Sequence, residues 1–125
     1  MKKDIMGKDK RRFLRFDASL GMKYKTLLSK AEEGIATLRN VSRSGMGFSV
    51  IKGKILPTGT SANFEIDVPG EGGSIFAKGK IVWSKEIFPE RVSLLTNGVE
   101  FVDITPIDKG ILLDYAYNQW VRKEL

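Results

Sequence analysis

Two short segments carry residues whose types and spacing suit the binding of a phosphate-bearing purine. Arg11 and Arg15 are spaced as R-x-x-x-R, and each guanidinium can bind a phosphate bidentately, bind the O6/N7 edge of guanine, or stack on the base. The second segment offers the amide of Asn40, the hydroxyl of Ser42, and Gly45, where the backbone approaches another group closely or adopts a positive φ. Together the segments predict a site for a small guanine-containing diphosphate, although a hairpin turn that satisfies its own backbone is an alternative for the second.

The composition argues against an enzyme. The chain has 125 residues and contains neither cysteine nor histidine. Histidine is the commonest general base and the commonest metal ligand, and thiolate chemistry needs cysteine. We therefore expect no catalytic residue, no metal and no cofactor. The 42% hydrophobic content is enough for a single domain with an ordinary core.

The net charge of +6 is concentrated near the N-terminus. Residues 1–15 contain seven Lys or Arg and two Asp or Glu, a net +5, so the remaining residues carry only +1. A nucleic-acid-binding protein usually spreads its basic residues over a face that follows many phosphates. The distribution therefore favours a compact anion and argues against DNA or RNA as a partner. Residues 1–8 are expected to form a flexible basic arm.

The sequence also indicates where in the cell the protein is found. No apolar segment approaches the roughly 20 residues that are needed to cross a bilayer. The polar opening at residues 1–4 is not followed by the apolar run of a signal peptide. We expect a cytoplasmic protein without a membrane span.

Period-two patterns predict six β-strands between about residues 22 and 103. The clearest pattern is at residues 63–68, where Phe64, Ile66 and Val68 alternate with polar side chains. Short turns separate the other five expected strands, which cover residues 23–27, 34–40, 46–50, 74–83 and 92–102. The expected fold is mainly β, a closed or nearly closed six-stranded antiparallel barrel.

The pattern becomes helical after the last strand. Thr105 suits the N-cap, Pro106 suits the first helical position, and Asp108 lies three residues after the cap. A helix is therefore expected over about residues 106–122, packed on the barrel.

One face of this helix carries apolar residues at spacings of three and four. The face predicted to dock on the barrel comprises Ile107, Ile111, Leu112, Tyr115, Ala116 and Gln119. Tyr117, Trp120 and Val121 fall elsewhere on the helix. They either broaden the buried face, which we favour, or form a surface for a partner.

Four motifs, in this order, resemble those of the PilZ domain family. The family has R-x-x-x-R followed by [D/N]-x-S-x-x-G. The matching positions here are Arg11, Arg15, Asn40, Ser42 and Gly45. Downstream, GKIVW at residues 79–83 is similar to the family's G-x-V-x-W strand, and GVEF at residues 98–101 is similar to its G-V-x-F strand. The resemblance covers about residues 9–120, and it implies that residues 9–125 form a single domain.

The resemblance implies a bacterial receptor for cyclic di-GMP, bound by the matching residues. Further candidate contacts are Lys10, Arg12, Arg43 and Trp83. Core packing is the favoured role for Trp83, because it alternates with apolar residues along its strand. The family often has aspartate where this chain has Asn40. Because an asparagine offers guanine one neutral acceptor in place of a carboxylate, binding is expected to weaken by as much as about tenfold or a little more.

The resemblance also implies a sensor that acts on an unidentified downstream protein. The ligand would order the N-terminal arginine loop, which then creates or exposes a surface for that partner. Lys10 precedes R-x-x-x-R, a position associated in the family with two stacked dinucleotides. The number of bound ligands, one or two, remains open. The oligomeric state, a monomer or a ligand-dependent dimer, also remains open.

Two alternatives come from other classes of protein. The first is a protein-interaction adaptor with the same fold and no nucleotide; such relatives commonly lack the arginine motif, which this chain has. The second is an oligonucleotide-binding barrel. It would need aromatic side chains on an exposed strand face, and the sequence offers few candidates beyond Trp83 and Phe76.

Overall fold

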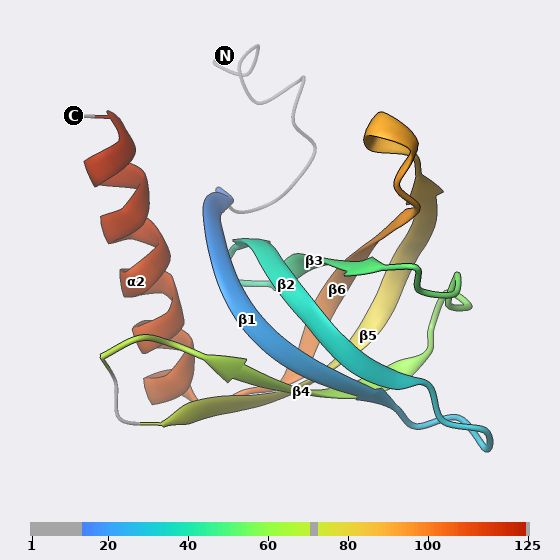
Figure 1. Cartoon of the computed structure of the whole chain (residues 1–125). Helices are drawn as coiled ribbons and strands as arrows, with labels where there is room; N and C mark the ends of the chain where they lie inside the picture. The colour runs from blue at the N-terminus through green and yellow to red at the C-terminus, as the bar shows by residue number, and fades with distance from the viewer. Residues whose placement is uncertain (1–13, 71–72, 125) are drawn as a thin grey trace, which may run out of the picture.

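The computed structural model describes residues 14–70 and 73–124, and it consists of a β-barrel with a helix beside it (Figure 1). The barrel is closed, with antiparallel strands in the order β1-β2-β3-β6-β5-β4. The elements are β1 Phe16–Thr26, β2 Glu33–Val41, β3 Gly45–Ile51, β4 Ser61–Asp67, β5 Ser74–Ile87, the 3₁₀ turn η1 Pro89–Arg91, β6 Leu94–Asp103 and α2 Pro106–Glu124. The prediction of a mainly β fold, a six-stranded antiparallel barrel with a C-terminal helix, is confirmed.

Alternation along the strands fills the barrel. In β4 the side chains of Ala62, Phe64 and Ile66 are buried, and the residues between them face outward or are only half-buried. Aromatic rings occupy the middle of the core, where Phe48 lies 5.5 Å, centroid to centroid, from both Tyr24 and Phe64. These contacts explain why the period-two pattern was a reliable guide to the strands.

Two strands are longer than the sequence indicated. β1 begins at Phe16, seven residues before the predicted start, and β5 continues to Ile87. In β1 the register shifts between Asp17 and Leu20, which breaks the alternation that sequence patterns detect. The same kind of shift occurs in β5 between Ile81 and Trp83.

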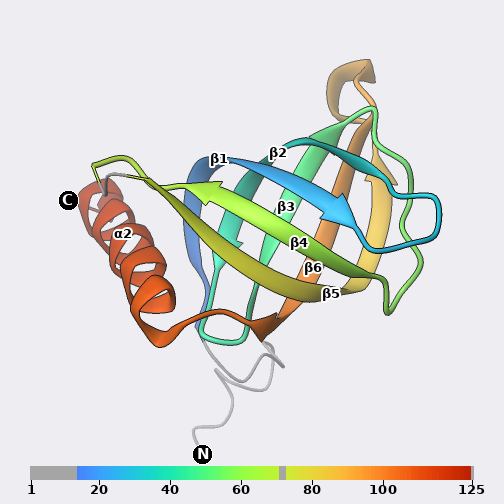
Figure 2. The same ribbon diagram turned by 90° about the horizontal axis from the view of Figure 1, so that it is seen from below.

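Helix α2 begins as predicted. The Thr105 hydroxyl accepts a hydrogen bond from the backbone N–H of Asp108 at 3.1 Å, and Pro106 is the first helical residue. The helix packs mainly on β1 and stands outside the barrel wall, beside β1 (Figure 2).

The predicted docking face was right at its centre and wrong at one end. Leu112 and Ala116 are fully buried, whereas Ile107 is 76% exposed. Ile107 precedes Ala116 by nine residues, which is two and a half turns at about 3.6 residues per turn, so the two side chains lie on opposite sides of the helix.

Gly45 has a structural role at the start of β3. It pairs with Glu100 of β6, and a Cβ added to Gly45 would overlap the backbone carbonyl oxygen of Val99. The close approach predicted for this glycine is therefore to the barrel's own backbone. Gly21 of β1, by contrast, has no atom within 4 Å of an added Cβ.

Gly45→Ala is expected to lower the free energy of unfolding by about 1–3 kcal/mol, because backbone must move to admit the methyl group. Gly21→Ala, the matched control in open space, is expected to be neutral or slightly stabilising. Urea denaturation followed by circular dichroism measures both. Equal stability of the two variants would contradict the structural role assigned to Gly45.

Candidate functional site

The structure brings Arg15 and Asn40 into direct contact. Arg15 lies just before β1, and its guanidinium donates a hydrogen bond from Nη1 to Asn40 Oδ1 at 2.6 Å. Asn40 lies near the end of β2, where its backbone pairs with Asp17. The two segments that the sequence singled out, 25 residues apart in the chain, therefore meet at one place. Lys10, Arg11 and Arg12 lie outside the described residues.

A row of four residues crosses four neighbouring strands at this place. Asn40 of β2 pairs with Gly47 of β3, Gly47 with Gly98 of β6, and Gly98 with Trp83 of β5. Residues paired in this way project to the same side of a sheet. The row therefore has an amide at one end, an indole at the other, and two positions without side chains between them.

Both end residues lean over the glycines. A Cβ on Gly47 would lie 2.9 Å from Asn40 Oδ1, and a Cβ on Gly98 would overlap the Trp83 indole. Any larger residue at either position would displace the side chain beside it. The two glycines thus form the floor of a trough, and Asn40 and Trp83 form its ends.

The position of Trp83 corrects the sequence interpretation, which favoured core packing. Ile81 is fully buried, but the register shift between Ile81 and Trp83 reverses the alternation, and Trp83 is 44% exposed on the outer wall. The exposed indole offers one face for stacking on a planar ligand.

A hollow of about 340 Å³ lies over the row. It is lined by Arg39, Asn40, Gly47, Phe48, Trp83, Lys85, Ile87, Thr96 and Asn97. The lining contains two cationic residues and no acidic one. With Arg15 hydrogen-bonded to Asn40 beside it, the hollow combines positive charge with an exposed aromatic ring. That combination suits an anionic ligand with a planar ring system.

Sequence reasoning missed two of the cations. Arg39 faces outward by the regular alternation that follows buried Leu38, and the register shift between Leu38 and Asn40 then places Asn40 on the same outer face; the Arg39 Nε donates to Ser49 Oγ at 2.9 Å. Lys85 follows Trp83 by two residues, and its Nζ lies 5.7 Å from the centroid of the indole. The i, i+2 spacing of Trp83 and Lys85 was the available signal for Lys85, and the alternation of Arg39 with buried Ala36 and Leu38 was the available signal for Arg39.

Ser42 and Gly45 form hydrogen bonds within the β2–β3 turn in this structure. The Ser42 N–H donates to the Gly45 carbonyl oxygen at 2.8 Å, and the buried Ser42 hydroxyl accepts from the Ser44 N–H at 3.3 Å. These are the bonds of the hairpin alternative. Arg43 is exposed on the same turn and lines a separate hollow beside the first turns of α2.

The part of the chain that the structure describes contains no group of three or more His, Cys, Asp or Glu side chains placed to hold a metal ion. Its α2 helix is too polar to span a membrane.

The chain is thus a small closed antiparallel β-barrel with one C-terminal helix and a cationic, aromatic hollow on its outer wall. The model of the PilZ domain matches residues 9–118, and the chain belongs to the PilZ family. No curated protein is similar enough in sequence to count as a match.

Solved structures share the fold. The Bacillus subtilis inhibitor of motility MotI/DgrA superposes with a TM-score of 0.71 at 20% identity, over 92% of this chain and 53% of its own. The PilZ domain of Escherichia coli YcgR, solved with c-di-GMP, gives 0.66 at 16% identity, over 93% and 95%. Borreliella burgdorferi PlzA in complex with c-di-GMP gives 0.59 at 14% identity, over 94% and 56%. The chain thus spans about half the length of MotI/DgrA and PlzA.

Gly98→Ala is expected to displace the Trp83 indole from the trough, because the added methyl group occupies its place. The emission of Trp83, measured in a Trp120→Phe background, should change in intensity and wavelength, whereas Gly21→Ala in that background should leave it unchanged. Identical spectra for the two variants would show that the indole does not lie over Gly98.

Proposed function

We propose that this chain is a regulatory receptor that binds cyclic di-GMP in the hollow over Gly47 and Gly98. The observation that carries the proposal is the contact between Arg15 and Asn40 at one end of that hollow, opposite Trp83. Family membership and the c-di-GMP named in the YcgR and PlzA structures support it. The protein acts by binding and not by catalysis.

Each side chain has a chemical role in this proposal. The Trp83 face stacks on a guanine, and the Asn40 carbonyl oxygen accepts from the base's N–H donors. Arg15 binds a phosphate or the guanine O6/N7 edge. Arg39 and Lys85 neutralise charge on the two phosphates. Ser42 and Gly45 act indirectly, by fixing the turn that follows Asn40.

The N-terminal segment completes the site. Within a domain at residues 9–125, Lys10, Arg11 and Arg12 supply further donors from the segment just before Arg15, and ligand binding orders this segment over the barrel, while residues 1–8 remain an arm. Ordering of a charged segment by a ligand is an established type of switch. The ordered segment then forms the surface that a downstream protein recognises.

Arg15→Ala is expected to weaken cyclic di-GMP binding by at least about tenfold, the value of one charge-assisted hydrogen bond. Isothermal titration of the full chain measures the dissociation constant and the number of ligands, with GTP and cyclic di-AMP as specificity controls. Lys30→Ala removes the same charge from the β1–β2 turn at the far end of β1 and should bind normally. A folded wild-type protein that gives no heat with any nucleotide would overturn the proposal and favour the adaptor alternative.

Lys85→Ala is expected to weaken binding by about two- to fivefold and to make it less sensitive to salt, because a screened surface charge contributes modestly. Lys78→Ala is the matched control, since Lys78 is also exposed on β5 but lines a different hollow. Equal affinities and equal salt dependences for the two variants would exclude Lys85 from the site.

A further inference from the structure

We infer that an aromatic cluster between β1 and α2 positions Arg15, so that ligand binding and the docking of the last turns of α2 are coupled. The aromatic cluster consists of Phe16, Tyr117 and Trp120. The inference rests on the proposed function only in treating Arg15 as a ligand contact. The positioning itself concerns the protein without ligand.

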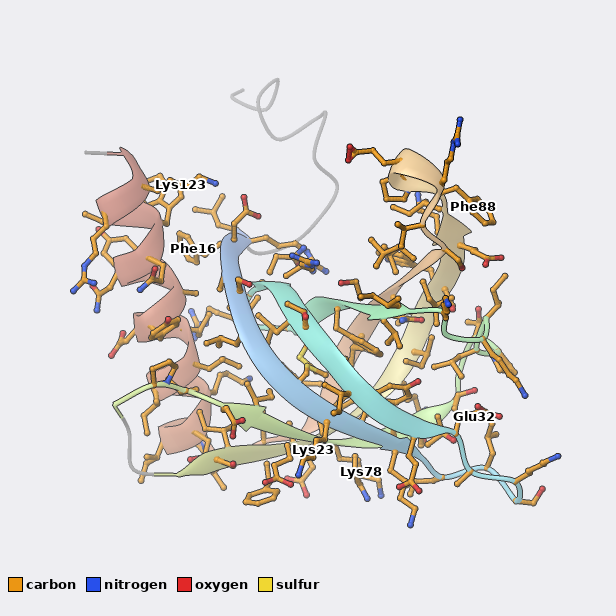
Figure 3. All side chains as sticks on the ribbon, viewed as in Figure 1. Phe16, Lys23, Glu32, Lys78, Phe88 and Lys123 are labelled. Atoms are coloured by element: carbon orange, nitrogen blue, oxygen red, sulfur yellow. The ribbon has the colours of Figure 1, made fainter. Side chains whose placement is uncertain are left out.

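The cluster is a set of three mutual ring contacts. Phe16 meets Tyr117 edge-on, with centroids 5.7 Å apart and an interplanar angle of 89°, and it lies 5.9 Å from Trp120. Tyr117 and Trp120 are themselves 5.9 Å apart. Figure 3 shows Phe16 at the start of β1, on the side that faces α2. Tyr117 and Trp120 are 49% and 41% exposed, so they do not belong to the core, contrary to the favoured sequence interpretation.

The start of β1 needs this support because it has a strand neighbour on one side only. β1 pairs with β2 from Phe16 onward, but its pairing with β4 begins at Met22. On the open side the rings of α2 take the place of the missing strand. Since Arg15 directly precedes Phe16, fixing the Phe16 ring fixes the backbone from which the Arg15 side chain reaches Asn40.

A second link runs through Arg39. This residue lines the ligand hollow and also a neighbouring hollow of about 520 Å³ between the barrel and the end of α2. The other residues that line the neighbouring hollow are Asp17, Ala18, Ser19, Gln119, Arg122 and Lys123. Three cationic side chains and a single carboxylate therefore line this neighbouring hollow.

This charge distribution sets the sign of the coupling. An anionic ligand that reaches Arg39 offsets the mutual repulsion of Arg39, Arg122 and Lys123, and so favours the docked position of the helix end. By reciprocity, a docked helix end raises the affinity for the ligand. Binding is then communicated to the half-exposed rings of Tyr117 and Trp120, which contact Phe16.

The test compares Trp120→Ala with Trp120→Phe, which retains an aromatic ring, and with Phe76→Ala, which removes an exposed ring from β5. In the ligand-free protein, NMR of the Asn40 side-chain amide reports whether Arg15 is in place. We expect Trp120→Ala to shift this signal toward its position in Arg15→Ala. Trp120→Phe and Phe76→Ala should leave it unmoved.

Isothermal titration and hydrogen exchange measure the coupling. Trp120→Ala should weaken cyclic di-GMP binding about three- to tenfold, Trp120→Phe should restore it, and the ligand should slow amide exchange over residues 117–123 of the wild type. An unmoved Asn40 signal in Trp120→Ala would overturn the positioning role, whether or not the protein binds the nucleotide. Unchanged affinity and exchange in a protein that does bind it would overturn the coupling alone. Absence of binding by the wild type would overturn the proposed function.

Discussion

The approach of two side chains over a pair of glycines is the constraint on which the site depends. Gly47 and Gly98 are paired across β3 and β6, and only their lack of side chains lets Asn40 and Trp83 lean inward over the barrel wall. The barrel fold accommodates such a trough with little loss of stability, because the inner face of the same strands still carries Phe48 and other core side chains. One wall therefore serves packing on its inside and binding on its outside.

Register shifts decide which residues reach that trough. The shift before Asn40 turns this residue to the outer face, and the shift before Trp83 turns the indole outward. Each bulge interrupts a ladder of hydrogen bonds and re-aims a side chain, which is the usual role of bulges near binding sites. Buried Asn97, next to Gly98, adds a further cost, since neither of its side-chain polar atoms has a hydrogen-bond partner among the described residues.

The limits of sequence reasoning follow from these bulges. Alternation predicted the strands, and capping chemistry predicted the start of α2 at Thr105, because both signals are local. The contact between Arg15 and Asn40 was anticipated from residue types at two distant segments. The outward turn of Trp83 was not anticipated, because a one-residue change of register leaves no trace in composition or spacing.

Asparagine at position 40 has a second consequence once Arg15 is seen bound to it. In the free protein the Asn40 carbonyl oxygen accepts from the guanidinium, so a ligand that uses either group must exchange that bond. A neutral acceptor releases a guanidinium more readily than a carboxylate does, because charge-assisted pairs are roughly twice as strong as neutral ones. Compared with an aspartate, Asn40 is thus a weaker acceptor for guanine and also a weaker competitor for Arg15. Arg15 is preorganised beside the hollow by Asn40 and the aromatic cluster, and it remains available to a phosphate that offers it a full negative charge.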